Sequence, residues 1–292
     1  MIRGRCVMKL IFRVTFKISL MLTILAGFAT AEEVRETDPG ALLNQGDALI
    51  EEGRYDRAIT CFNKAIEINP KYAEAYNSRG MAYTKKGRYD KAISDFNKAI
   101  EIDPRYACPY NNRGFACACK GQHDKAFADF NKAIEIDPKY PEAYNNLGLI
   151  YRQKGQYDKA FVEMTKAIEL NPKYAGAYLN RGNTYALKGH YGKAITDYTK
   201  VIEIDPKDAA AYRCRALVYM GQGHLDNVIA DFNTAIALDQ SDARAYNNRA
   251  VAYFIKKKYE AAWDDVHRAQ NLGYIVHPAF LDALRQASGG EK

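Results

Sequence analysis

Cysteine and histidine gather in one short stretch of the chain, at Cys117, Cys119 and His123. Thiolate and imidazole are preferred ligands of zinc in proteins, so this stretch is the strongest candidate for metal chemistry. However, Cys117 and His123 both stand where similar stretches of the chain mostly hold tyrosine. We therefore favour packing roles for these side chains and expect no metal and no cofactor. A metal protein or enzyme built on the three residues is the alternative, which metal analysis of the purified protein would decide.

The other histidines do not extend this chemistry. His190 and His224 recur at equivalent places in predicted turns, whereas His267 and His277 stand alone. None has a nucleophile or a carboxylate at a spacing that would form a catalytic set. The sequence also carries no glycine-rich phosphate loop. We predict that the protein is not an enzyme.

Arginine and aspartate recur together at a separation of 16 residues. The five pairs are Arg79 with Asp95, Arg113 with Asp129, Arg181 with Asp197, Arg215 with Asp231, and Arg249 with Asp265. Two equivalent places lack the arginine, and there the chain has Gln45 with Cys61, and Leu147 with Glu163. Because the two residue types are present or absent together, we predict an ion pair that joins two neighbouring helices.

The elements that position these residues repeat every 34 residues. The period is marked by Pro70, Pro104, Pro138, Pro172 and Pro206. A fixed period in this range is typical of solenoid proteins. Residues 71–104 show the unit most clearly.

The first half of this unit predicts a helix that ends in a turn. Tyr76, Gly80 and Tyr83 lie on one helical face because they are spaced by four and three residues. Gly80 has no side chain, so another helix can approach closely there. Gly87 is expected to end the helix in the left-handed conformation that glycine adopts readily.

The second half predicts another helix, antiparallel to the first. We expect Asp90 to cap its start. Ala92, Phe96 and Ala99 form its buried stripe, and Pro104 ends it because proline disfavours helix in the residue before it. One such hairpin cannot bury its own apolar face, so the copies must stack.

The recurring set resembles the tetratricopeptide repeat (TPR) signature. In residues 71–104 it comprises Tyr76, Gly80, Tyr83, Gly87, Ala92, Phe96, Ala99 and Pro104. Seven copies begin near Thr37, Lys71, Arg105, Lys139, Lys173, Lys207 and Ser241, and they occupy residues 37–274. The resemblance implies an all-α fold, a right-handed superhelical solenoid of helical hairpins whose first helices line the concave surface. The end copies depart from the signature: copy six has Ala216 and copy seven has Ala250 and Lys257 at glycine positions.

The resemblance also implies a peptide-binding groove along the first helices. Asparagine recurs there at one position, as Asn44, Asn112, Asn146, Asn180 and Asn248, and again nearby as Asn77, Asn111, Asn145, Asn183 and Asn247. An apolar track runs beside it through Met81, Phe115, Leu149, Leu187, Leu217 and Ile255.

Asparagine supplies both a donor and an acceptor, which match the two hydrogen-bonding groups of a peptide backbone. The arrangement is similar to the asparagine ladder of O-linked N-acetylglucosamine transferases and kinesin light chains. The alternative is that these side chains only solvate the helices.

We therefore predict a non-catalytic scaffold that binds a protein or peptide segment in the concave groove. The second hypothesis is an assembly factor of a cell-envelope or secretion complex that uses the convex face and edges. The sequence leaves open whether the protein forms a homo-oligomer.

Residues 1–31 have the layout of a secretory signal peptide. Five basic residues and no acidic ones precede an apolar run over residues 18–28, and a small-x-small site ends at Ala31. We expect cleavage near Ala31, a short linker over residues 32–36, and a secreted or periplasmic protein that leaves the membrane. The alternative is an uncleaved anchor, although the uncharged run is shorter than the roughly 20 residues of a spanning helix.

Loss of this leader would change the charge of the protein. The whole sequence carries 42 basic and 35 acidic residues, a net charge of +7, and removing the five basic residues of the leader lowers this to +2. A nearly neutral protein offers no general electrostatic attraction for nucleic acid or anionic membranes. We expect neither as a partner.

The C-terminal segment, residues 275–292, breaks the repeat. His277 and Pro278 are expected to start a short helix over residues 279–287. Phe280, Leu281 and Leu284 would place apolar side chains on one side of it. We predict a capping helix that covers copy seven.

Overall fold

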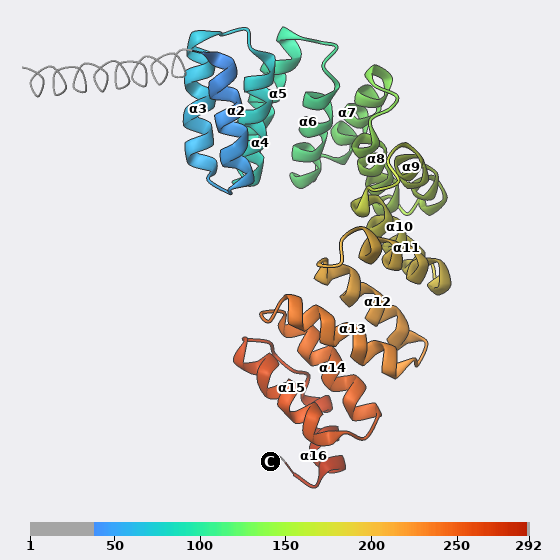
Figure 1. Ribbon diagram of the computed structural model, residues 1–292. Helices are drawn as coiled ribbons and strands as arrows, with labels where there is room; N and C mark the ends of the chain where they lie inside the picture. The colour runs from blue at the N-terminus through green and yellow to red at the C-terminus, as the bar shows by residue number, and fades with distance from the viewer. Residues whose placement is uncertain (1–37, 291–292) are drawn as a thin grey trace, which may run out of the picture. The chain divides into compact units, whose positions relative to one another are not determined.

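A computed structural model describes residues 38–290, and every regular element in that range is an α-helix (Figure 1). The helices fall into two units, divided between Pro138 and Lys139. The first unit contains α2 (Pro39–Glu51), α3 (Tyr55–Ile68), α4 (Ala73–Lys85), α5 (Tyr89–Ile102), α6 (Ala107–Cys119) and α7 (His123–Ile136). The predicted leader, the linker and Thr37 lie outside the described residues.

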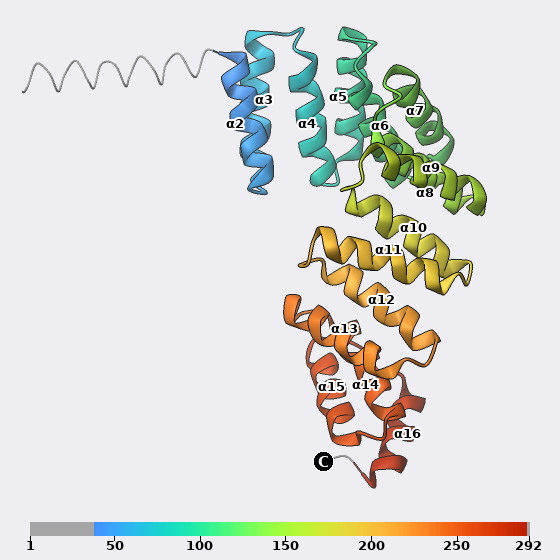
Figure 2. The same ribbon diagram turned by 45° about the vertical axis from the view of Figure 1, so that its right-hand side comes forward.

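The second unit holds the four remaining hairpins and one additional helix. It contains α8 (Pro141–Gln153), α9 (Tyr157–Leu170), α10 (Ala175–Leu187), α11 (Tyr191–Ile204), α12 (Ala209–Gly221), α13 (Leu225–Leu238), α14 (Ala243–Ile255), α15 (Tyr259–Asn271) and α16 (Pro278–Ser288). In both units the two helices of each copy pack against each other, and the second helix of a copy packs against the first helix of the next (Figure 2). The predicted all-α fold of stacked hairpins is confirmed.

A buried side chain, large in six of the seven copies, fills the centre of each hairpin. The residues at this position are Phe62, Phe96, Phe130, Met164, Tyr198, Phe232 and Val266, all fully buried. In copy two the Phe96 ring lies against Gly80, where an added Cβ atom would come within 2.6 Å of the ring. Glycine therefore allows the close approach predicted at this contact, because a side chain here would displace the Phe96 ring from its position.

The turn between the two helices depends on glycine in six copies and on lysine in one. Gly87 has a φ of 70°, which confirms the predicted left-handed cap. In copy seven the same place is taken by Lys257, with a φ of 59°. A side chain is disfavoured in this region of φ because its Cβ atom crowds the backbone. Copy seven thus carries local strain that the other copies avoid.

Exchanging these two residue types should change stability in opposite directions. We expect Gly87→Ala to lower the free energy of unfolding by about 1 kcal/mol, and Lys257→Gly to raise it by a similar amount. Urea unfolding followed by circular dichroism would measure both. A destabilising effect of Lys257→Gly would contradict this account of the turn.

The prediction that Asp90 caps its helix is wrong. Helix α5 begins at Tyr89, its N-cap is Arg88, and no side chain caps it. Asp90 instead lies inside the first turn and forms an ion pair with Lys120 of the following copy. Equivalent pairs join Asp56 to Lys86 and Asp226 to Lys256. Between copies five and six the chain has Gly192 and Gln222 at these positions, so both partners are missing together.

The predicted arginine–aspartate ion pairs are confirmed in all five copies. In each, Nε and one terminal nitrogen of the guanidinium donate to the two carboxylate oxygens, at 2.6–2.9 Å. The aspartate side chains are only 4–10% exposed. Hydrogen bonding to the aspartate raises the pKa of Arg113, which stays charged. The pair fixes the register of the two helices in a hairpin.

The same guanidinium also reaches the preceding copy. Its other terminal nitrogen donates to a side-chain oxygen 16 residues earlier, at 2.6–3.0 Å. The acceptors are Asn63, Asn97, Thr165, Thr199 and Asn233. One arginine therefore connects three helices, which the spacing of arginine and aspartate alone did not predict.

Helix α16 packs against α15 at the end of the second unit. Leu284 is fully buried, and Phe280 and Leu281 pack on the same apolar cluster. The Phe280 ring meets that of Phe254 edge to face, with centroids 5.6 Å apart. At its start, Nδ1 of His277 accepts a hydrogen bond from the backbone N–H of Ala279. Between residues 38 and 290, no helix has both the length and the apolar character that a membrane span requires.

Candidate binding surface on the first helices

Several first helices of neighbouring copies contact one another directly. In the first unit α2 contacts α4, and α4 contacts α6; in the second, α10 contacts both α8 and α12. We call the solvent-facing side of α2, α4 and α6 in one unit, and of α8, α10, α12 and α14 in the other, the first-helix surface. Each unit thus carries its own part of this surface.

The predicted apolar track lies on this surface and is largely exposed. The exposed fractions are 36% for Met81, 46% for Phe115, 65% for Leu187, 44% for Leu217 and 52% for Ile255. Only Leu149 is half-buried. These five make up half of the large hydrophobic side chains that are exposed within the described residues. Exposed large apolar side chains that recur on the first helices of each unit are typical of interaction sites.

Three of the predicted asparagines do not face solvent. Asn77, Asn111 and Asn145 are 3–5% exposed, at odds with the expectation that they point into a groove. Nδ2 of Asn77 donates to the Tyr106 hydroxyl at 3.5 Å, and Nδ2 of Asn145 donates to that of Tyr174 at 3.3 Å. Buried amides need such partners, because an unsatisfied polar group in the interior is costly. Asn77 and Asn145 thus link neighbouring copies, whereas Nδ2 of Asn111 donates to Oδ1 of the adjacent Asn112 at 3.3 Å.

The asparagine position that directly follows the buried one is more accessible. The buried asparagine of the preceding copy orients the side chain at this position. Nδ2 of Asn112 donates to Oδ1 of Asn77 at 2.9 Å, and Nδ2 of Asn180 donates to Oδ1 of Asn145 at 3.0 Å. An asparagine amide has two N–H donors and an oxygen with two lone pairs. Asn180 therefore keeps one N–H and its oxygen outside this bond, in an orientation that the preceding copy fixes.

The remaining asparagines of the predicted set differ in exposure. Asn44 is exposed, whereas Asn146, Asn183, Asn247 and Asn248 are half-buried. Oδ1 of Asn183 accepts from the Tyr198 hydroxyl at 2.8 Å, which fixes the orientation of this amide as well.

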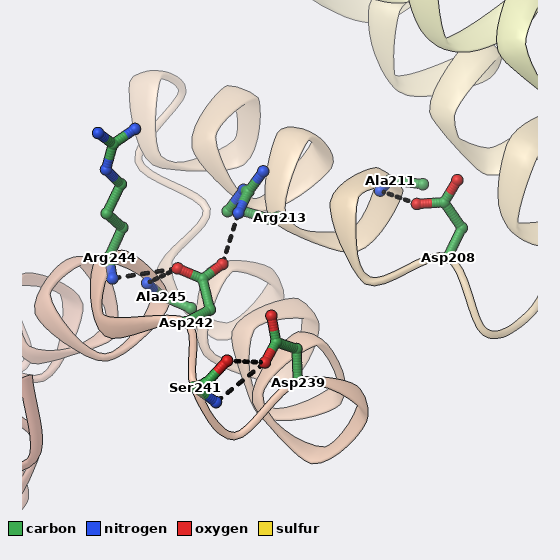
Figure 3. Close-up of polar contacts among 8 residues, drawn as sticks. All are labelled: Asp208, Ala211, Arg213, Asp239, Ser241, Asp242, Arg244 and Ala245. Atoms are coloured by element: carbon green, nitrogen blue, oxygen red, sulfur yellow. Dashed lines mark hydrogen bonds and ion pairs between the residues drawn. The ribbon is translucent and has the colours of Figure 1, made fainter. Parts of the chain in front are cut away.

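In copies six and seven an ion pair replaces the asparagine contact. Figure 3 shows Arg213 reaching the Asp242 carboxylate, with Nη1 and Oδ2 separated by 2.6 Å. The same carboxylate accepts from the backbone N–H groups of Arg244 and Ala245, while the Arg244 side chain points away from it (Figure 3). Arg213 is thus neutralised by its neighbour. The sequence carries the signal, since Asp208 and Asp242 replace the tyrosine found at this position in copies two to five.

One arginine of the second unit lacks such a neighbour. Arg152 on α8 is half-buried, and burial lowers the pKa of its guanidinium. No carboxylate of the described residues forms an ion pair with it. It lies three residues after Leu149, so both side chains occupy the same face of the helix. Sequence reasoning missed this residue, because a single arginine in one copy does not show periodicity.

Cys117 and Cys119 lie on α6, and His123 lies at the start of α7. Cys117 is buried in α6, and burial raises the pKa of its thiol. Cys119 is exposed and interacts with the Tyr89 hydroxyl, and His123 begins α7. No group of three or more metal-ligating side chains is found within residues 38–290.

The comparison with protein families matches most of the chain. A family model described as "TPR repeat" matches residues 46–87, 116–151, 148–189 and 182–223, more than half of the chain. Models described as "Tetratricopeptide repeat" match residues 73–106, 96–128 and 215–270. No curated protein matches the sequence.

Several solved structures are similar in fold. The APC/C hetero-tetramer Cut9–Hcn1 has a TM-score of 0.70 and 19% identity over 85% of this chain and 48% of that chain, so this chain spans about half of that one. A tetratricopeptide repeat protein from Parabacteroides merdae has a TM-score of 0.59 and 21% identity, over 86% of this chain and 99% of that chain. A thermophilic TPR protein from Thermus thermophilus has a TM-score of 0.57 and 25% identity, over 62% of this chain and 99% of that chain.

Proposed function

Because the chain belongs to the tetratricopeptide repeat family, we propose that it binds a protein or peptide segment along its first-helix surface. The repeats and the similar structures support a protein-interaction scaffold. The main support for this location of the binding site is the exposed apolar track of Met81, Phe115, Leu187, Leu217 and Ile255. Covering such side chains releases water from apolar surface, which is the main favourable contribution to association.

The asparagines beside the track would bind the backbone of that segment. Asn112 and Asn180 are held by bonds to the preceding copies, so little side-chain freedom is lost when they bind. Their amides match the N–H and C=O groups of an extended chain, whatever its sequence. Side-chain preference would come from the apolar track and, in the second unit, from Arg152, which would favour an acidic residue. From the sequence of residues 1–31 alone, we also propose that the chain is exported.

Matched sets of substitutions test this location. Phe115→Ser/Leu187→Ser/Leu217→Ser removes three exposed apolar side chains from the first helices. Ile68→Ser/Tyr191→Ser/Leu238→Ser does the same on the second helices, where these residues are 39–45% exposed. Exposed substitutions of this kind change stability little, so both variants should fold. We expect the first variant to capture its partners at least about tenfold less well after crosslinking in cells, because roughly 1.5–3 kcal/mol is lost per buried side chain.

The second variant should capture the same partners as wild type. Loss of partners in the second variant, with retention in the first, would contradict the proposal. That result would favour an assembly factor that uses the second helices and edges of the repeats.

A further inference from the structure

Copy four lacks the arginine that joins the helices of five other copies. Leu147 stands at the arginine position, and Glu163 at the aspartate position. Leu147 is buried and makes no polar contact. The acidic group has therefore been kept, one methylene longer, in a hairpin without the base that pairs with it elsewhere.

The five complete copies show what binds a guanidinium in this fold. The aspartate accepts two hydrogen bonds from it, and a tyrosine three residues before the arginine lies under its central carbon. The carbon lies 5.4–5.7 Å from the centroid of Tyr76, Tyr110, Tyr178, Tyr212 or Tyr246. Within its own hairpin, each arginine is therefore bound by a carboxylate and an aromatic face, in addition to its contact with the preceding copy.

Copy four retains both of these groups beside an open space. Tyr144 and Glu163 are equivalent to the tyrosines and aspartates of the other copies, and both line a pocket of about 520 Å³. Phe161, Val162 and Thr165 of α9 form more of its wall. Glu163 is half-buried, and no basic side chain of the described residues forms an ion pair with it.

The charges around the pocket leave Glu163 unneutralised. The other charged residues of the lining are Lys166 and Glu169, which pair with each other at 3.3 Å. Burial raises the pKa of Glu163, as expected for a carboxyl group that has lost water and gained no cation. A bound cation would remove this cost.

We infer that this pocket binds an arginine side chain of a protein partner, which takes the place of the arginine that copy four does not have. Arginine suits the pocket better than lysine because its planar guanidinium can donate two parallel hydrogen bonds to one carboxylate and lie on an aromatic ring. The site lies on α8 and α9 of the second unit and involves none of the apolar track. It goes beyond the proposed function and does not depend on it.

Titration with N-acetyl-arginine amide tests the site directly. This probe carries the side chain between two amides, as in a polypeptide. Methyl NMR of the full chain should show saturable shifts at Val162, with a dissociation constant on the order of millimolar. Glu163→Gln should abolish the shifts, and N-acetyl-lysine amide should bind at least about threefold more weakly. Equal shifts in wild type and Glu163→Gln, or no saturable shift in wild type, would overturn the inference.

A second variant rebuilds the missing pair within the chain. Leu147→Arg/Glu163→Asp gives copy four the residues of the other five copies. We expect it to raise the Tm by about 2–4 °C and to eliminate binding of the probe, because the pocket is then filled. Retention of binding in this variant would contradict the assignment. The Phe115→Ser/Leu187→Ser/Leu217→Ser variant should bind the probe like wild type, so failure of one proposal can be told from failure of the other.

Discussion

Asp129→Ala should lower the free energy of unfolding by about 3 kcal/mol. Asp129 is 7% exposed and accepts two hydrogen bonds from Arg113, at 2.9 and 2.6 Å. Its removal leaves the guanidinium between two helices with only Asn97 and the Tyr110 ring as partners. The loss of stability arises mainly because the Arg113 guanidinium is left buried without a counter-charge, and less because the ion pair itself is strongly stabilising. Urea unfolding would measure it.

A double-mutant cycle separates these two contributions. Arg113→Ala should destabilise wild type clearly more than it destabilises the Asp129→Ala variant, because in the latter the guanidinium has already lost its carboxylate. The double variant should therefore be more stable than the sum of the single effects predicts. Equal losses in both backgrounds would show that the two side chains do not act as a pair.

Phe130→Ala should destabilise the protein by about 3–5 kcal/mol. The ring is 1% exposed and lies against Gly114, where an added Cβ atom would come within 2.8 Å of it. Alanine would leave a cavity between the two helices of copy three. Neighbouring copies would lose support as well, since each hairpin buries its apolar face on the next.

Copy four supplies the control for this substitution. Met164 occupies the position of Phe130 there and is fully buried against Gly148. Phe130→Met should consequently cost less than about 1.5 kcal/mol, because methionine fills an irregular space of similar volume. Thermal and urea unfolding of both variants would check the difference. Similar costs for alanine and methionine would mean that the cavity is not the cause.

The hairpins could be predicted from sequence because their determinants are local and recur seven times. Gly80 and Phe96 pack against each other and Gly87 forms the left-handed turn, and the structure confirms each of these roles. The arginine–aspartate pairs could also be predicted, since comparison of the seven copies shows that the two residue types occur together. Asp90 misled because aspartate near a helix start usually caps it. Here Lys120, thirty residues later, competes for the same carboxylate.

The surface was harder to predict than the fold. Asn111 and Asn112 are adjacent and chemically identical, so sequence alone could not show that one is buried and the other partly accessible. That difference depends on how the hairpins stack, which brings Asn112 to Asn77 of the preceding copy. The pocket beside Glu163 in copy four could likewise not be predicted from Leu147 and Glu163 in the sequence. Their joint departure from the pattern was visible, but only the packed helices show a pocket there.

Site-specific photocrosslinking tests the central claim, binding along the first-helix surface, most directly. p-Benzoylphenylalanine would be introduced singly at Phe115 and Leu217 on the first helices, and at Ile68 and Leu238 on the second helices. All four positions are exposed, so the probe should be tolerated. We predict crosslinks to the same partner from Phe115 and Leu217 and none from Ile68 or Leu238. Crosslinks from Ile68 and Leu238 alone would contradict the account and place the partner on the second helices.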